Sequence, residues 1–180
     1  MEIGSSVRPH PYHKMKLRTY IEEYLAYKGY YNAINEYGLH EVHLNVLDIT
    51  RTFIDKLMAI KRHALCGTLQ NKVRHIYDIT KMFESKGITD FLQDKKQLKM
   101  ILKLTKETDS YYLVKRDLPK EYNPLGSYDF ERWIHKLDKK IKNRYETLHL
   151  DLLYTDQKQD FALAKSILKK VNTFFLAIDE

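Results

Sequence analysis

The sequence predicts a mainly helical fold, a helical bundle with one or two short strands on its N-terminal side. Apolar residues recur every three or four positions along most of the chain after residue 50, which is the period of an amphipathic helix. A single stretch, Val42 to Val46, alternates apolar and polar residues as a strand does. We therefore expect a strand–helix–strand region over residues 1–48. A helical domain over residues 49–180 should follow and end in an antiparallel helix pair.

The N-terminal region should begin in extended conformation, because Pro9 and Pro11 disfavour a helix over residues 1–13. A helix is predicted over residues 14–28, with an apolar stripe that includes Leu17, Ile21 and Leu25, and Gly29 should end it. A polar and aromatic stretch then leads to a half-buried strand over residues 40–46.

Three helical stretches are expected in the middle of the chain. Asp48 is a plausible N-cap for a helix over residues 50–65, which Cys66 and Gly67 interrupt. A second helix should run over residues 69–84 and end at Gly87. Residues 88–110 form a further helical stretch, rich in lysine.

The last third of the chain predicts a loop and two long helices. Pro119, Pro124 and Gly126 indicate a loop over residues 111–128. Apolar residues from Phe130 to Tyr145 and from Phe161 to Phe175 then follow helical spacing, so these helices should fold back on each other.

Composition limits the classes of protein that fit. The chain has 31 basic and 24 acidic residues, a formal net charge of +7, which favours polyanionic partners such as nucleic acid. The apolar runs are far too short to cross a membrane. Cys66, the single cysteine, cannot form an internal disulfide, and the N-terminus lacks the pattern of a secretory signal. We expect a cytoplasmic protein.

A lysine in the first of these middle helices is the first candidate for chemistry. On a helix, Thr52 and Lys56 lie one turn apart on the same face. A lysine held there could contact a nucleoside triphosphate as a point charge and stabilise the leaving pyrophosphate. The alternative is that Lys56 is an ordinary solvated lysine.

The second candidate is the run Arg74-His75-Ile76-Tyr77-Asp78. Arg74 and Asp78 are four residues apart and could form an ordinary surface ion pair. The functional interpretation is that Asp78 orients a lysine or a base on the neighbouring helix, while Arg74 or His75 meets phosphate. A turn near Gly67 would bring Lys56 close to Asp78.

Other candidates are weaker. His40 and His43 should point to opposite faces of a strand and make poor joint metal ligands, and no Cys/His cluster indicates zinc. Gly4-Ser5-Ser6 lacks the glycine spacing of a phosphate-binding loop. The lysines over residues 95–99 and 136–142 are interpreted as solvated helix faces, with contact to RNA as the alternative.

Taken together, these segments resemble the AbiEii/AbiGii family of nucleotidyltransferase toxins, in order and along nearly the whole chain. Arg51-Thr52-Phe53-Ile54-Asp55-Lys56-Leu57 is similar to the family's Arg-Thr-Phe-x-x-Lys-Leu helix. Arg74-His75-Ile76-Tyr77-Asp78 matches its Arg-His-x-Tyr-Asp motif, the more specific of the two. The opening Glu2 to Ser6 and the final helices are also of the family's type.

The resemblance implies the helical part of a polymerase-beta-type nucleotidyltransferase that acts in a toxin–antitoxin or phage-defence system. Such an enzyme uses Mg²⁺ to move a nucleotide from an NTP to an acceptor, for several members the 3′ end of tRNA. Lys56 would contact nucleotide phosphates, with Thr52, Arg74 and His75 as further nucleotide contacts. Asp78 would complete the active site, and Glu2 would take the place of a metal-supporting carboxylate.

One departure from the family pattern is large. The family's Gly-Ser motif and Asp-x-Asp pair, which hold the metals, would precede residue 1, and no Asp-x-Asp occurs in the chain. We therefore expect a carboxy-terminal portion that is incomplete alone. The alternatives are a non-catalytic helical module that binds tRNA or a partner protein, and terminal helices that dock a cognate antitoxin.

Overall fold

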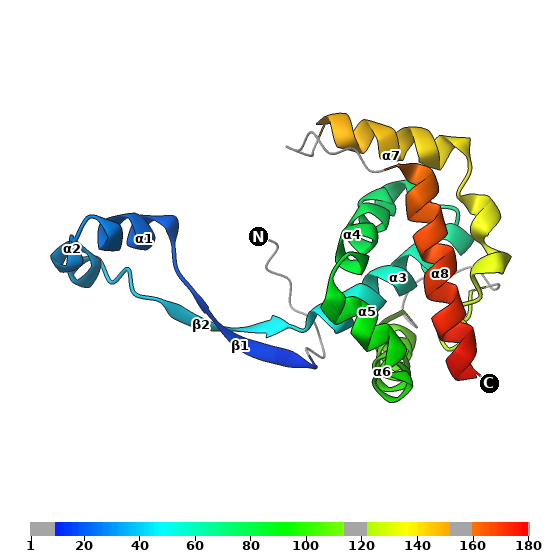
Figure 1. Ribbon diagram of the computed structural model, residues 1–180, viewed down its shortest axis with the longest axis horizontal. Coiled ribbons are helices and arrows are strands. Elements are labelled where there is room, and N and C mark those ends of the chain that lie inside the picture. The colour runs from blue at the N-terminus through cyan, green and yellow to red at the C-terminus, as the bar shows by residue number, and fades with distance from the viewer. Residues whose placement is uncertain (1–9, 114–121, 152–159, 180) are drawn as a thin grey trace. The chain divides into compact units, whose positions relative to one another are not determined.

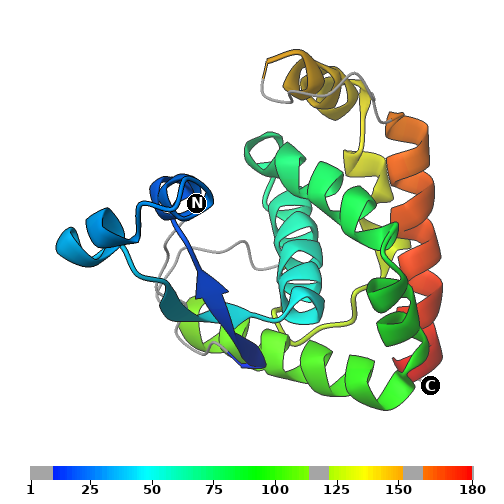
Figure 2. The same ribbon diagram turned by 60° about the vertical axis from the view of Figure 1, so that its left-hand side comes forward.

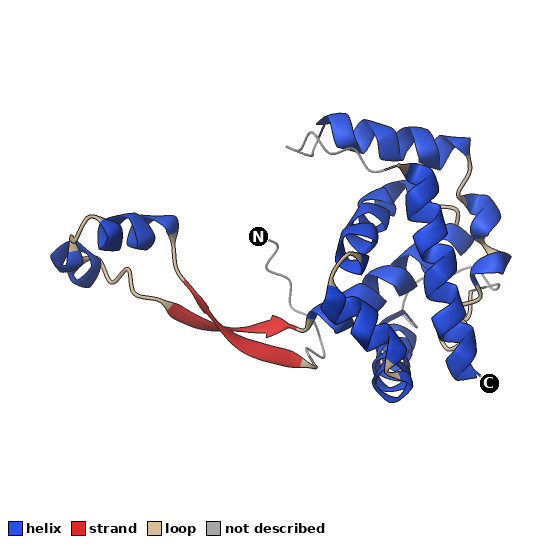
Figure 3. Ribbon diagram, viewed as in Figure 1, coloured by secondary structure: helices blue, strands red, loops and turns tan. Residues whose placement is uncertain are grey.

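The computed structural model describes residues 10–113, 122–151 and 160–179. The chain divides into two compact units, which we call unit 1 (Met1–Asp48) and unit 2 (Ile49–Glu180). Figure 3 shows that helices dominate and that the strands of the described part belong to unit 1. The predicted mainly helical fold with short N-terminal strands is thereby confirmed. The assignment of residues 1–48 to the end of a catalytic region remains a prediction.

Unit 1 is a two-stranded antiparallel ribbon whose strands are joined by two short helices (Figure 1). Tyr12 lies opposite Leu47, and Leu17 lies opposite Val42. The described elements are β1 (Tyr12–Leu17), α1 (Tyr20–Tyr27), α2 (Tyr31–Glu36) and β2 (Val42–Leu47).

The helix predicted over residues 14–28 is wrong in its first part, because residues 12–17 form β1. Met15 and Leu17 alternate with lysines, which is the two-residue pattern of a strand. Pairing with β2 favours the strand over the helix. The helix starts only at Tyr20, where the Thr19 hydroxyl oxygen accepts a hydrogen bond from the Glu22 amide at 3.1 Å.

The end of this helix is as predicted. Gly29 has φ of 77°, a left-handed conformation that glycine adopts without steric cost. The amide of Gly29 donates to the Ala26 carbonyl, and the amide of Tyr30 donates to the Leu25 carbonyl. This pair of bonds is the Schellman pattern of helix ends. The polar and aromatic stretch that follows contains the short helix α2.

The strand predicted over residues 40–46 exists, but it is not half-buried. Val42, Leu44 and Val46 are 41–52% exposed. The pairing places them on the same face as Met15 and Leu17, which are exposed as well. In the described part of unit 1 the one buried apolar residue is Ile34, so the ribbon has an apolar face and no core beneath it.

Unit 2 holds the hydrophobic core of the described chain. Its elements are α3 (Ile49–Leu65), η1 (Leu69–Lys72), α4 (Val73–Phe83), α5 (Lys86–Gln93), α6 (Lys95–Leu113), η2 (Phe130–Arg132), η3 (Ile134–Lys136), α7 (Lys139–Asp151) and α8 (Phe161–Asp179), where η denotes a 3₁₀ turn. None of the described helices combines the length and the apolar character that crossing a membrane requires.

The helix α3 runs through the middle of unit 2 in both Figure 1 and Figure 2, and it packs against α4, α5 and α6. Nine of its 17 residues are buried, a wider face than the predicted stripe of Phe53, Leu57, Ile60 and Ala64. Burial of each large apolar side chain of this kind contributes about 1.5–3 kcal/mol. Gly67 ends α3 with φ of 70°, as predicted.

Two predicted boundaries between α4 and α6 are wrong. Gly87 does not end a helix but lies inside α5, because the chain turns two residues earlier at Ser85, whose ψ of 132° is extended. The stretch over residues 88–110 is two helices, divided at Asp94. The Asp94 carboxylate accepts a hydrogen bond from the Gln97 amide at 3.0 Å and so caps α6.

The prediction of one long helix from Phe130 to Tyr145 is also wrong. Its apolar residues are buried as expected, but Phe130 to Lys136 form two 3₁₀ turns, and α7 starts only at Lys139. Leu137, with ψ of 61°, leaves helical conformation, and the Asp138 carboxylate accepts the Ile141 amide at 2.9 Å to begin α7.

The terminal helices do not form the predicted antiparallel pair. Figures 1 and 2 show α7 running across α8 instead of along it. The buried side of the shortened α7 packs mainly against α4 and η1, and it meets α8 over a small area. The helix α8 itself is as predicted, with Phe161, Ala164 and Phe175 buried.

An aromatic cluster joins the 3₁₀ turns to α8. Trp133 packs edge-on against Tyr128 and Phe130, with ring centroids 5.5 and 4.8 Å apart. The indole nitrogen of Trp133 donates to the Tyr128 carbonyl at 3.1 Å. The buried Asn172 of α8 accepts a hydrogen bond from the Phe130 amide at 3.1 Å, which fixes the start of η2.

This last bond gives a first prediction. Asn172→Leu should lower the free energy of unfolding by about 1–3 kcal/mol, because the buried Phe130 amide loses its acceptor. Urea denaturation followed by circular dichroism measures the change. Asn143→Leu on the exposed side of α7 is the matched control and should stay within about 0.5 kcal/mol of the parent. Equal losses in both variants would show that the Asn172 bond contributes nothing.

Candidate nucleotide-contacting site

Two helices that meet in the core of unit 2 bring the candidate site together. Lys56 lies on α3 and Asp78 on α4, and these helices pack against each other on either side of the turn at Gly67. The Lys56 Nζ atom donates a hydrogen bond to Asp78 Oδ2 at 2.7 Å. The approach of these two residues, predicted from their spacing along the chain, is thereby observed.

The Lys56–Asp78 pair lies at the edge of the core. The two side chains are 24% and 23% exposed, so the pair is neither fully solvated nor sealed. A charge-assisted bond in such a place is stronger than one between freely mobile surface side chains. The ammonium is therefore held in a fixed position that solvent and ligands can still reach.

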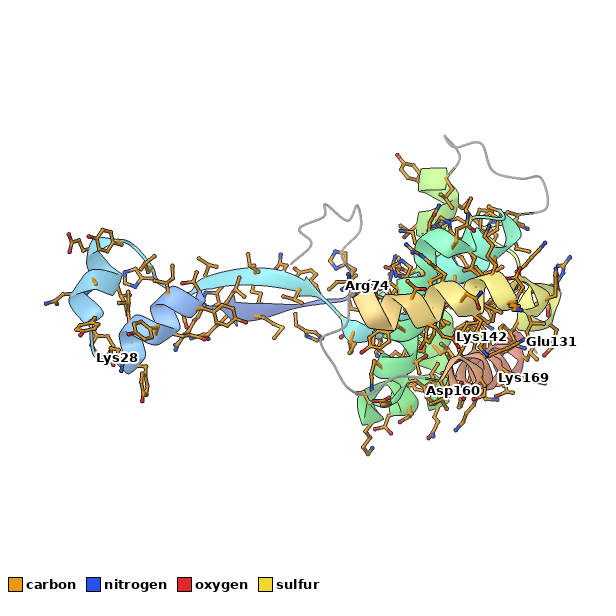
Figure 4. All side chains as sticks on the ribbon, turned by 90° about the horizontal axis from the view of Figure 1, so that it is seen from above. Lys28, Arg74, Glu131, Lys142, Asp160 and Lys169 are labelled. Carbon is orange, nitrogen blue, oxygen red and sulfur yellow. The ribbon has the colours of Figure 1, made fainter. Side chains whose placement is uncertain are left out.

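His75 completes a cluster with this pair. Its Nδ1 atom lies 3.5 Å from Lys56 Nζ and 3.8 Å from Asp78 Oδ2, and its side chain is 24% exposed. Arg74, by contrast, is exposed at the surface of unit 2 (Figure 4). Within the described chain no ion pair joins Arg74 to Asp78, so the predicted four-residue pair does not form.

The electrostatics of the cluster favour an ionised Asp78. Partial burial opposes ionisation, but hydrogen bonds from His75 and Lys56 and the positive charges of Lys56 and Arg74 outweigh it, so the pKa of Asp78 lies below its usual value. Asp78 is thus a permanent anion near neutral pH. Its role in the described structure is to hold the Lys56 ammonium.

The remaining predicted residues have different outcomes. Thr52 lies on α3 one turn before Lys56, as expected, and is half-buried. Glu2, predicted to support a metal, lies outside the described residues. Among the side chains that the structure describes, no group of three from His, Cys, Asp or Glu is arranged to hold a metal ion. Asp78 is the one carboxylate of the Lys56–His75–Asp78 cluster and is bonded to Lys56, so this cluster alone does not fit the two-metal Mg²⁺ site that the resemblance implies.

Other polar residues of α3 were missed by the sequence reasoning. Arg51 is 2% exposed, and its Nε donates to Asp55 Oδ1 at 2.7 Å. Lys61 is 4% exposed. The burial of Lys61 could have been predicted, because Lys61 follows Leu57 by four residues and so lies on the apolar stripe of the helix.

The comparison with known families decides the identity of the chain. The family model of the nucleotidyl transferase AbiEii toxins of type IV toxin–antitoxin systems matches residues 1–166. The chain belongs to this family. No curated protein and no solved structure matches it.

Membership of the AbiEii family confirms the resemblance on which the candidate site rests. It indicates nucleotidyl transfer by a toxin, an NTP as substrate and an antitoxin as partner. The cluster on α3 and α4 suits nucleotidyl transfer in one respect. A lysine ammonium that a carboxylate holds near the surface is a point charge suited to phosphate oxygens.

The lowered pKa of Asp78 gives a second prediction. A depressed pKa means that the ionised form stabilises the folded state above the unfolded value of 3.8, and that this contribution is lost as the pH falls through the folded value. At neutral pH the free energy of unfolding of the parent should exceed that of Asp78→Asn by about 1 kcal/mol. The difference should shrink below about pH 4 in urea denaturation at a series of pH values.

The pair Lys86–Asp90 is the control for this experiment, because it joins the same residue types on the exposed side of α5. Asp90→Asn should change the free energy of unfolding little at any pH. A difference for Asp78→Asn that stays constant down to about pH 2 would show that the ionised carboxylate is not what stabilises the fold.

Proposed function

We propose that this AbiEii chain takes part in nucleotidyl transfer from an NTP to the 3′ end of tRNA, in the cytoplasm, as the toxin of a toxin–antitoxin or phage-defence system. The observation that carries the proposal is the fixed ammonium of Lys56, bonded to Asp78 at 2.7 Å on motifs of the matching family. The tRNA acceptor comes from the family resemblance, and the net charge of +7 is compatible with it.

In the proposed reaction the acceptor hydroxyl releases its proton to solvent, and its oxygen forms a bond to the α-phosphorus of the NTP. The bond from that phosphorus to the bridging oxygen of the leaving pyrophosphate breaks, and negative charge develops on the pyrophosphate. The Lys56 ammonium lies against the phosphates and stabilises that charge, as preorganised cations do in phosphoryl transfer.

The other residues of the cluster support Lys56 in this proposal. Asp78 positions the ammonium through the hydrogen bond at 2.7 Å. In the proposal, His75 and Arg74 meet further phosphate oxygens. His75 lies 3.5 Å from the Lys56 nitrogen, Arg74 is exposed, and Thr52 lies one turn before Lys56 on α3. The family resemblance adds Mg²⁺, but the cluster alone does not fit its site, and no step above depends on it.

The third prediction tests Lys56. Purified chain is incubated with Mg²⁺, labelled NTPs and total tRNA, and incorporation of label into tRNA is measured. Lys56→Ala should lower the rate about 10²–10³-fold, because the developing charge loses a preorganised cation. Asp78→Asn should also lower it, since the ammonium is no longer held. Lys86→Ala, which removes a paired but exposed lysine, should leave the rate unchanged.

Three outcomes would separate the hypotheses. Incorporation that survives Lys56→Ala would remove Lys56 from the mechanism. Binding of tRNA without incorporation would favour a non-catalytic tRNA-binding module. The resemblance implies metal-binding carboxylates on a separate catalytic sheet. The assay is therefore repeated in the presence of any polypeptide that the native locus encodes directly upstream. Absence of incorporation there as well would overturn the proposed reaction.

A further inference from the structure

A second basic side chain of α3, Lys61, is buried without a carboxylate partner among the described residues. It is 4% exposed, and its ammonium donates to the backbone carbonyls of Gly126 (3.3 Å) and Ser127. The ring of Tyr122 lies 6.0 Å from the same nitrogen. Carbonyl oxygens and an aromatic ring compensate a buried charge only in part, because neither carries a full negative charge.

The surroundings of Lys61 add to this imbalance. Burial, followed by the positive charges of Lys106 and Arg132, lowers the pKa of Lys61 to about 8, although Asp129 and Asp109 act in the opposite direction. An environment that disfavours the ammonium to this degree is one that a bound anion would relieve.

A cavity of about 190 Å³ opens beside Lys61. By the share of liquid volume that one water takes, it has room for about six waters or a molecule of similar size. Its walls combine polar groups with apolar and aromatic surface. They include Lys61, Asn123, Ser127, Asp129, Arg132 and Trp133.

The charges of the wall favour a ligand with one negative charge. Arg132 Nε lies 3.8 Å from Asp129 Oδ2, so these two largely neutralise each other. The ammonium of Lys61 then remains as the unmatched charge. Leu65 and Trp133 are apolar residues of the wall, which suits a carbon skeleton better than a symmetric, multiply charged ion.

Two residues that line the cavity have further unusual features. The hydroxyl of Tyr128, 1% exposed, has no hydrogen-bond partner among the described residues. Asp129 has φ of 34°, a left-handed conformation that is uncommon outside glycine and that proteins retain chiefly where the surroundings require it. Both residues line the same cavity.

We propose that this cavity is a binding site for a small carboxylic acid in its anionic form, whose carboxylate contacts the Lys61 ammonium with Arg132 at the solvent side. The site is separate from the proposed nucleotide contacts, because Lys56 and Asp78 do not line it. A failure of the proposed nucleotidyl transfer would therefore not affect this proposal.

The fourth prediction uses the single tryptophan as a probe of the site. Trp133 lines the cavity, and its indole N–H gives one resonance that needs no assignment. Titration of the ¹⁵N-labelled chain with sodium acetate or propionate at pH 7 should shift this resonance saturably, with Kd on the order of 1 mM. Sodium chloride at equal ionic strength should leave it in place.

Variants and pH give the control measurements. Lys61→Met should weaken acetate binding at least tenfold, and Arg132→Gln, at a side chain that is 77% exposed, should weaken it about threefold. Lys99→Met, an exposed lysine of α6, should have no effect. Between pH 7 and pH 9 affinity should fall about tenfold as the Lys61 ammonium loses its proton near pH 8.

Three results would overturn the proposal. The first is an indole resonance that acetate and propionate do not shift beyond the chloride control. The second is a shift of equal size and affinity in Lys61→Met and Arg132→Gln. The third is saturable binding of inorganic phosphate without binding of the carboxylates, which would replace the proposed ligand class.

Discussion

Unit 2 depends on one constraint. Its central helix α3 carries basic side chains, and each of them needs a carboxylate or another hydrogen-bond acceptor from the residues around it. Removing a cation from water costs several kcal/mol unless partners compensate it. Each of three cations, five residues apart, has a different partner. Arg51 bonds Asp55 of α3 and Thr108 of α6, Lys56 bonds Asp78 of α4, and Lys61 bonds carbonyls of the segment before η2. The neighbours of α3 are thus fixed by charge as well as by apolar packing.

The sequence predicted the part of this arrangement that follows from helical periodicity. The helices α3 and α8 have the apolar positions expected for them, and the turn at Gly67 brings Lys56 to Asp78. Such features depend on residues within one helix or across one short turn. Local period and local turn chemistry therefore suffice to find them.

The missed features depend on partners far away in the chain. The segment over residues 12–17 is a strand because residues 42–47 pair with it, and local periodicity alone did not decide between strand and helix. Phe130 to Tyr145 kept helical spacing, yet Asn172 of α8 fixes the Phe130 amide and Asp138 starts α7 afresh. The burial of Lys61 likewise follows from carbonyls more than 60 residues later.

The unequal burial in the two units has a thermodynamic consequence. The heat capacity change of unfolding and the dependence of stability on denaturant both scale with the surface that becomes exposed. Among the described residues, nearly all buried apolar side chains belong to unit 2, and Ile34 alone belongs to unit 1. Calorimetric transitions therefore report on unit 2. The amides of β1 and β2, in a two-stranded ribbon without a core, should exchange hydrogen with solvent through local opening that leaves the heat capacity almost unchanged.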